Sequence, residues 1–134
     1  MRKKNIYKLN GDNQFLCNYC RKLQDALTIR QIIEPPYKLL INIDYGKNRK
    51  YQPSSFQIYD IINITEFIPY DYKKQIKYRI LCKCTSYGSN YVAYCRNADN
   101  NKWYEFNDSV CAEVKDKNSI YRINPYLLLY ERFE

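Results

Sequence analysis

The sequence contains no histidine, and this absence excludes several kinds of catalytic site. A cysteine–histidine dyad cannot be built within this chain, because no imidazole is present to deprotonate a thiol. Gly-x-Ser-x-Gly, a Walker-type phosphate loop and His-Glu-x-x-His are absent as well. The 134 residues therefore carry no standard catalytic motif.

Long apolar runs are also missing. No stretch approaches the roughly 18 consecutive apolar residues of a membrane span, so no membrane association is predicted. The first ten residues, MRKKNIYKLN, are basic but lack the apolar segment of a signal peptide. We expect an intracellular protein, cytoplasmic or nuclear, whose six cysteines are reduced thiols or metal ligands rather than disulfides.

The residues that are present favour one folded domain with a basic surface. Apolar residues make up 46% of the chain, which is enough for a single core. The net charge is +8, spread along the chain rather than concentrated in one block. Such a charge permits contact with RNA or an acidic protein surface, although an ordinary solvated surface explains it equally well.

Runs rich in β-branched and aromatic residues predict strands between turn signals. The predicted strands are residues 37–45, 56–65, 78–87, 91–97, 102–106 and 125–132, with a polar loop at 46–55. Gly88 favours a hairpin between two of these strands. The sequence thus predicts an α+β domain dominated by antiparallel β-sheet.

Three segments allow more specific or competing predictions. Residues 21–33 fit either a helix or a strand at TIRQII, and residues 66–72 fit a turn or a single helical turn that ends at Pro69. Residues 107–114 fit one helical turn, capped by Asn107 or Asp108. Glu105 and Asp108 could in principle perform acid–base chemistry, but turn and cap roles explain them more simply.

The cysteines raise the question of zinc. Cys17 and Cys20 have the Cys-x-x-Cys spacing that lets both sulfurs reach one metal ion. Cys82 and Cys84 share one face of a predicted strand, and these four residues could complete a site, although nothing in the spacing specifies it. The preferred interpretation is that Cys82, Cys84, Cys95 and Cys111 are small buried residues, which leaves no cofactor, or possible zinc at Cys17 and Cys20.

Taken in order, several segments resemble the carboxyl-terminal half of the ubiquitin-specific protease family, the papain-like deubiquitinases. The segments are FLCNYC (15–20), PPYKLLINIDY (35–45), YRILCKC (78–84), SNYVAYCR (89–96), KWYEFNDSV (102–110) and PYLLLYER (125–132). In SNYVAYCR, Asn90 stands where the family has its catalytic histidine, and Ser89 replaces the preceding glycine. Asn107, 17 residues later, matches the residue that orients this histidine, with Asp108 adjacent. Asp44 and Tyr45 depart from the arginine–phenylalanine pair that the family favours.

The resemblance implies one partial domain over residues 1–134. Residues 1–36 would be a remnant of the zinc-finger or fingers region, and residues 37–134 a palm-like sheet. The catalytic cysteine and the first cysteine pair of the zinc finger would belong to an amino-terminal half outside these residues. The expected fold is therefore the palm and fingers part of the family, with no catalytic residue and an incomplete metal set at Cys17 and Cys20.

The function implied by the resemblance is that of a catalytically inactive module that binds proteins or acts as a scaffold. Ubiquitin is a possible ligand, with Tyr91 and Trp103 as candidate contacts. One alternative is a basic structural subunit of a larger protein or ribonucleoprotein assembly. Another is one half of a split deubiquitinase, against which Asn90 counts, because a second chain would have to insert a histidine into a folded sheet.

Overall fold

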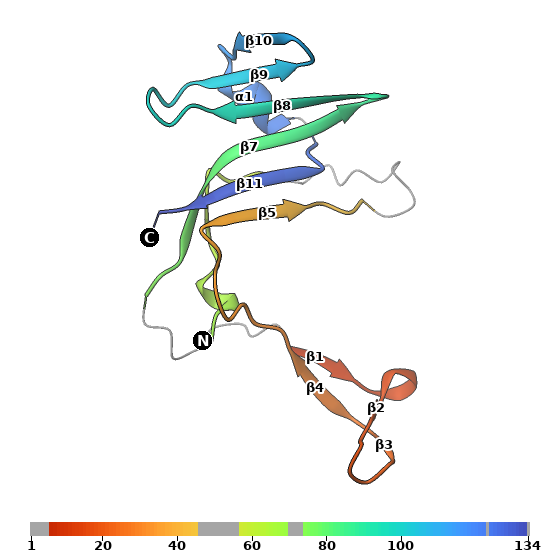
Figure 1. The fold of residues 1–134 in the computed structure, drawn as a ribbon. Helices are drawn as coiled ribbons and strands as arrows, with labels where there is room; N and C mark the ends of the chain where they lie inside the picture. The colour runs from red at the N-terminus through yellow and green to blue at the C-terminus, as the bar shows by residue number, and fades with distance from the viewer. Residues whose placement is uncertain (1–5, 46–56, 70–73, 123, 134) are drawn as a thin grey trace.

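The computed structural model describes residues 6–45, 57–69, 74–122 and 124–133. The elements in chain order are β1 (Ile6–Leu9), η1 (Gly11–Asn13), β2 (Phe15–Leu16), β3 (Leu23–Gln24), β4 (Ala26–Ile29), β5 (Lys38–Asn42), β6 (Ile61–Asn63), η2 (Thr65–Phe67), β7 (Lys77–Tyr87), β8 (Asn90–Arg96), β9 (Trp103–Asn107), β10 (Val110–Glu113), α1 (Lys117–Arg122) and β11 (Leu127–Arg132) (Figure 1).

A seven-stranded antiparallel sheet forms the body of the molecule. Its strand order is β10-β9-β8-β7-β11-β5, and β6 pairs with one end of β7. Consecutive strands from β7 to β10 are joined by hairpins, whereas β11 returns after α1 to lie between β7 and β5. This arrangement confirms the expected fold, a mainly antiparallel β-sheet with little helix.

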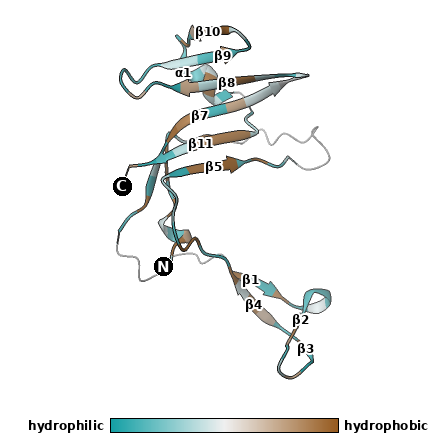
Figure 2. Ribbon diagram, in the orientation of Figure 1, coloured by the Kyte–Doolittle hydropathy of each residue, from teal (hydrophilic) through white to brown (hydrophobic). Residues whose placement is uncertain are grey.

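One face of the sheet carries the core. Tyr78 and Ile80 on β7, Tyr94 on β8 and Tyr130 on β11 are at most 5% exposed, and Ile120 of α1 is fully buried with them. Figure 2 shows hydrophobic residues along β5, β7 and β11, and hydrophilic residues at the turn between β8 and β9. The burial of large aromatic and branched side chains is the main force that holds this face together.

A β-bulge in β7 shifts the alternation of its side chains. Leu129 pairs with Cys82 and Tyr130 with Ile80, so Leu81 has no partner across the ladder. Because one extra residue reverses the alternation, Lys83 and Thr85 lie on the same buried face as Ile80. Both are at most 3% exposed.

The amino-terminal residues form an arm that extends away from the sheet (Figure 1). It consists of two small antiparallel ladders, β1 with β4 and β2 with β3. The strand β4 covers Thr28 and Ile29, so the helix considered for residues 21–33 is wrong. The large apolar side chains of the arm are exposed, for example Leu16 at 54% and Leu27 at 64%, because ladders this narrow have no second layer to pack against.

Two other predictions need correction. Residues 110–113 form strand β10 rather than a helical turn, and Asn107 and Asp108 belong to the β9–β10 hairpin instead of capping a helix. Asp108 has φ +50°, a left-handed conformation that aspartate tolerates in turns. The strand predicted at 56–65 is confined to Ile61–Asn63 among the described residues, followed by the short helix η2. The predicted polar loop at 46–55 lies outside the described residues.

The helix α1 was not predicted. Its start carries a recognisable signal, because Asp116 Oδ1 accepts a hydrogen bond from the backbone N–H of Asn118 at 3.0 Å. At six residues it is too short to be stable alone, and its buried residue Ile120 ties it to the sheet. Among the described residues, no helix is long and apolar enough to cross a membrane.

Candidate functional site

The two asparagines singled out in the sequence lie at one end of the sheet. Asn90 is the first residue of β8, opposite Tyr87, after the turn at Gly88, which has φ +61°. Asn107 ends β9 and pairs with Val92. Since residues two apart on a strand share a face, Asn90 and Asn107 lie on one face as diagonal neighbours, with Cα atoms roughly 7–8 Å apart.

The chemistry of this pair is limited. An asparagine side chain is a neutral amide that donates and accepts hydrogen bonds but does not take up a proton near neutral pH. Asn90 is exposed and Asn107 is half-buried, and Asp108 lies beside them in the exposed turn. The register places the two amides on one face of the sheet, and neither side chain can act as a base near neutral pH.

The two candidate ligand contacts differ in exposure. Tyr91 is 65% exposed, and its ring meets that of Tyr126 edge to face with centroids 5.5 Å apart. Trp103 is 3% exposed and lies in the core. Of the two, only Tyr91 offers its ring to a macromolecular ligand at the surface.

Three cysteines gather on the face of the sheet opposite the core. Cys82 and Cys95 are direct partners across β7 and β8, and their sulfurs share a hydrogen bond of 3.1 Å. This bond lowers the pKa of Cys95 to about 7, because the Cys82 thiol stabilises the Cys95 thiolate, and it raises the pKa of Cys82. Burial raises the pKa of Cys84.

The prediction of four small buried cysteines therefore needs correction. Cys82, Cys84 and Cys95 are half-buried, and Cys111 is exposed on β10. Strand β10 is the edge of the sheet, and this explains the exposure of Cys111. Because one face of the sheet carries no part of the core, residues of β7 and β8 on that face stay partly accessible.

The pair Cys17 and Cys20 occupies the tip of the arm. The backbone N–H of Cys17 donates to Lys22 O at 3.0 Å, and Arg21 N–H donates to Cys17 O at 2.7 Å, which closes a tight turn. Hydrogen bonds from the backbone N–H groups of Cys20 and Tyr19 lower the pKa of Cys17. Such a turn suits two thiolate ligands of a tetrahedral zinc, and Cys17 and Cys20 would hold two of its four positions.

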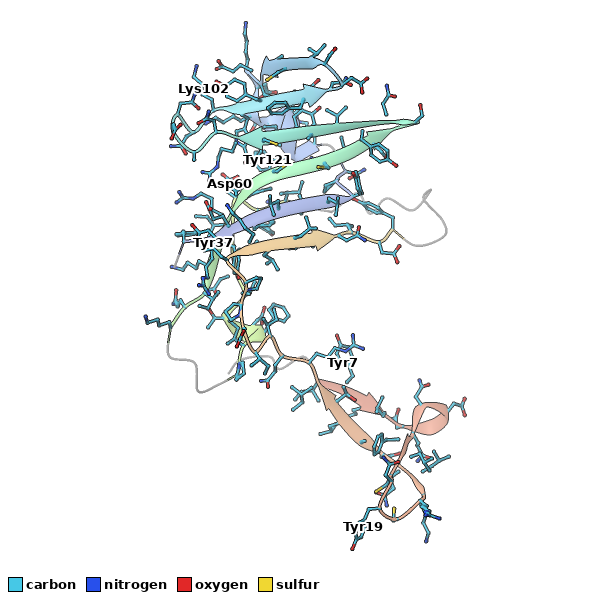
Figure 3. All side chains as sticks on the ribbon, viewed as in Figure 1. Tyr7, Tyr19, Tyr37, Asp60, Lys102 and Tyr121 are labelled. Carbon is cyan, nitrogen blue, oxygen red and sulfur yellow. The ribbon has the colours of Figure 1, made fainter. Side chains whose placement is uncertain are left out.

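The structure does not bring Cys82 and Cys84 to that turn. The arm extends away from the sheet that holds Cys82 and Cys84 (Figure 1), and Figure 3 labels Tyr19 at the tip of the arm. Within the described ranges, no group of three or more cysteine or acidic side chains could hold a metal ion. The four-cysteine site considered from the sequence is therefore not formed.

The chain is similar to known proteins along most of its length. The model of the family described as ubiquitin carboxyl-terminal hydrolase matches residues 3–130. The probable ubiquitin carboxyl-terminal hydrolase R319 of Acanthamoeba polyphaga mimivirus is 28% identical over 134 residues, covering 92% of this chain and 28% of that protein.

Solved structures show the same relationship. The SAGA Ubp8/Sgf11/Sus1/Sgf73 DUB module bound to ubiquitin aldehyde matches with a TM-score of 0.68 at 17% identity, over 98% of this chain and 32% of that chain. A Ubp8–Sgf11–Sgf73–Sus1 SAGA DUB module matches with a TM-score of 0.67 at 16% identity, over 98% and 29%. The chain thus spans less than a third of these relatives, and the likeness confirms the expected fold.

Proposed function

Since the chain belongs to the ubiquitin carboxyl-terminal hydrolase family, we propose that it is a catalytically inactive module of the ubiquitin-specific protease type that binds other proteins. The observation that carries this proposal is Asn90. It begins β8 on the same face as Asn107, where the resemblance calls for a histidine and its orienting residue. No histidine exists elsewhere in the 134 residues to replace it.

The proposal follows from what the base must do. A cysteine protease needs a group that takes the thiol proton near neutral pH. An amide at that place leaves the thiol protonated, whichever chain supplies it. Asn107 would then have only another amide to orient, which supports a module that has lost its reactivity.

Ubiquitin is the proposed ligand. The relative Ubp8 has been seen in a DUB module bound to ubiquitin aldehyde. In this chain Tyr91, which follows Asn90 on β8 and points to the other face of the sheet, supplies an exposed ring held by its contact with Tyr126. Aromatic side chains fixed in this way contribute strongly to protein interfaces. We further propose the division of the domain into an arm, residues 1–36, and a palm-like sheet, residues 37–134.

Binding can be tested with isotopically labelled ubiquitin. We expect its amide resonances to shift on titration with this chain, with a Kd in the high micromolar range or tighter, roughly −5 kcal/mol or more favourable. Tyr91→Ala should weaken binding about fivefold or more. Tyr19→Ala is the matched control, because Tyr19 is 99% exposed but lies in the arm. Unchanged ubiquitin spectra at millimolar chain would remove ubiquitin as the ligand.

Inactivity is tested separately with a ubiquitin–fluorophore substrate. We expect no hydrolysis above the buffer rate, by the chain alone or together with whatever co-purifies with it. Turnover that disappears on Asn90→Ala would contradict the inactive assignment and support a split deubiquitinase.

The charge of the chain supports a second candidate, a basic subunit of a protein or ribonucleoprotein assembly. Phosphate contacts release counterions, so the affinity of such an assembly falls steeply as salt rises. Association that is unaffected by nuclease treatment and by moderate salt would argue against an RNA partner.

A further inference from the structure

A cavity of about 320 Å³ opens at the end of the sheet opposite to Asn90. It lies where β6, the last residue of β8, the first residue of β9 and α1 meet. Its lining includes Asp60, Arg79, Arg96, Trp103, Lys117 and Tyr121. Figure 3 shows Asp60 and Tyr121 close together at this end of the sheet. The cavity shares no residue with the Asn90–Asn107 site.

The charges around the cavity are unbalanced. Arg79, Arg96 and Lys117 contribute three positive charges against the single carboxylate of Asp60, a difference of +2. Within the described part of the chain, none of the three cations forms an ion pair. Asp60 already accepts a hydrogen bond from the Tyr121 hydroxyl. Burial and the nearby charge of Arg79 lower the pKa of Arg96, and the carboxylates of Asp60 and Glu131 offset part of this effect.

Arg96 also has an unused donor. Its Nε is buried and has no hydrogen-bond partner among the described residues. Its Nη1 makes only a long contact of 3.4 Å to Asn101 Oδ1. A buried guanidinium N–H without an acceptor is unfavourable, and an oxyanion in the cavity would supply that acceptor.

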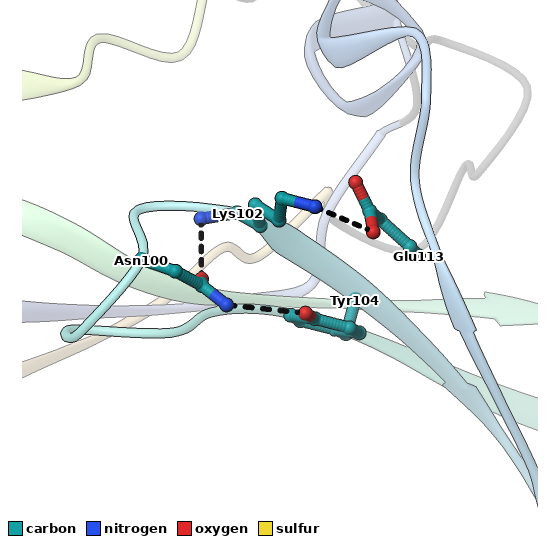
Figure 4. Close-up of polar contacts among 4 residues, drawn as sticks. All are labelled: Asn100, Lys102, Tyr104 and Glu113. Carbon is teal, nitrogen blue, oxygen red and sulfur yellow. Dashed lines mark hydrogen bonds and ion pairs between the residues drawn. The ribbon is translucent and has the colours of Figure 1, made fainter.

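The turn that holds Asn101 is fixed by its own hydrogen bonds. Asn100 Oδ1 accepts from the backbone N–H of Lys102 at 2.9 Å, and Asn100 Nδ2 donates to Tyr104 Oη at 3.3 Å (Figure 4). Lys102, which precedes β9, forms an ion pair with Glu113 at the end of β10, with Nζ and Oε2 3.0 Å apart. The charge of Lys102 is therefore engaged outside the cavity, and the turn presents Asn101 and Arg96 in a defined arrangement.

We propose that this cavity binds the phosphate group of a small ligand between Arg79, Arg96 and Lys117. A phosphate carries about −1.5 to −2 charges near neutral pH, so it neutralises more of the positive excess of the lining residues than a carboxylate does. The planar guanidinium fork of Arg96 suits paired hydrogen bonds to phosphate oxygens. The apolar wall formed by Ile61 and Ile80 leaves room for a small attached group.

The test uses the intrinsic fluorescence of Trp103, which is the one tryptophan of the chain and lines the cavity. Inorganic phosphate and O-phosphoserine are titrated at constant ionic strength set with chloride. We expect a saturable change with a Kd near about 1 mM or below for at least one of them. The tighter ligand identifies free phosphate or a phosphate monoester as the source.

Variants locate the binding in the cavity. Arg96→Gln should weaken phosphate binding about tenfold, and Lys117→Gln about threefold. Arg30→Gln makes the same change of charge in the exposed segment after β4 and should leave binding unaltered. Lys117 is exposed, so its variant keeps the test valid if Arg96→Gln does not fold.

A direct readout is the Nε–H resonance of Arg96, which should move downfield when phosphate accepts its hydrogen bond. The proposal is overturned if neither phosphate compound gives saturation up to about 10 mM. It is equally overturned if acetate binds as tightly as phosphate, or if both cavity variants bind like the unmodified chain.

Discussion

Lys83 is a fully buried cation, and replacing it by methionine tests how much free energy the burial of its charge costs. The side chain is 0% exposed, and Nζ donates a hydrogen bond to the backbone carbonyl of Ile120. That carbonyl belongs to the last turn of α1, where carbonyl groups lack a partner within the helix. Lys83 thus caps the carboxyl end of α1 and fastens it to the sheet.

The free-energy cost of burying the Lys83 charge follows from the shift in the pKa of its side chain. Burial lowers the pKa of Lys83 from 10.5 to about 8. At about 1.36 kcal/mol for each pKa unit, charging Lys83 in the folded protein costs on the order of 3 kcal/mol below pH 8. Between the folded pKa and 10.5 the unfolded chain binds more protons, so this contribution to stability rises with pH.

The Lys83→Met variant removes the charge while keeping an unbranched side chain. We compare the free energy of unfolding of Lys83→Met with that of the unmodified chain. The variant's free energy minus that of the unmodified chain should be about 2 kcal/mol larger near pH 7 than near pH 10. Urea unfolding followed by the fluorescence of buried Trp103 measures both free energies. Taking the difference cancels the titration of the tyrosines, which affects both proteins alike.

Lys115→Met is the control, because Lys115 is exposed and its stability difference should vary by less than about 0.5 kcal/mol. A difference for Lys83→Met that stays constant over the same pH range would refute the reasoning, since it would mean that Lys83 is not desolvated in the fold.

Three further predictions concern other sites. The alkylation rate of Cys95 should reach half its maximum near pH 7, and Cys82→Ala should move that midpoint upward, because the hydrogen bond that stabilises the Cys95 thiolate is lost. Mass spectrometry of the labelled peptide measures the rate at each pH, and an unmoved midpoint would contradict the hydrogen bond between the two thiols. Ile120→Ala should lower the free energy of unfolding by about 2–5 kcal/mol, whereas the control Ile33→Ala, at a residue that is 69% exposed, should lower it by under about 1 kcal/mol. Equal losses in urea unfolding would show that α1 does not pack on the core. Gly88→Ala should cost about 1 kcal/mol, because φ is +61° with nothing within 4 Å of a built Cβ, and a calorimetric Tm that does not fall would rule out the left-handed turn.

The parts of the fold that were predicted depend on local chemistry. The strands β7, β8, β9 and β11 follow from runs of β-branched and aromatic residues, and the hairpin at Gly88 follows from a residue that accepts positive φ. The parts that were missed depend on distant contacts. The helix α1 needs the burial of Ile120 and the hydrogen bond from Lys83, which lies 37 residues earlier. Residues 107–114 fit a helical turn locally, and strand β10 depends on its ladder with β9, its one partner among the described strands.

The candidate sites divide in the same way. The absence of an imidazole and the asparagines at positions 90 and 107 can be read from the sequence, because they depend on residue identity and order alone. The pairing of Cys82 with Cys95 and the burial of Trp103 follow from the packing of the folded chain. The same packing brings Arg79, Arg96 and Lys117 around one cavity. Register and topology bring together residues far apart in the chain, and the energy of those contacts, summed over the whole sheet, has no local signature in the sequence.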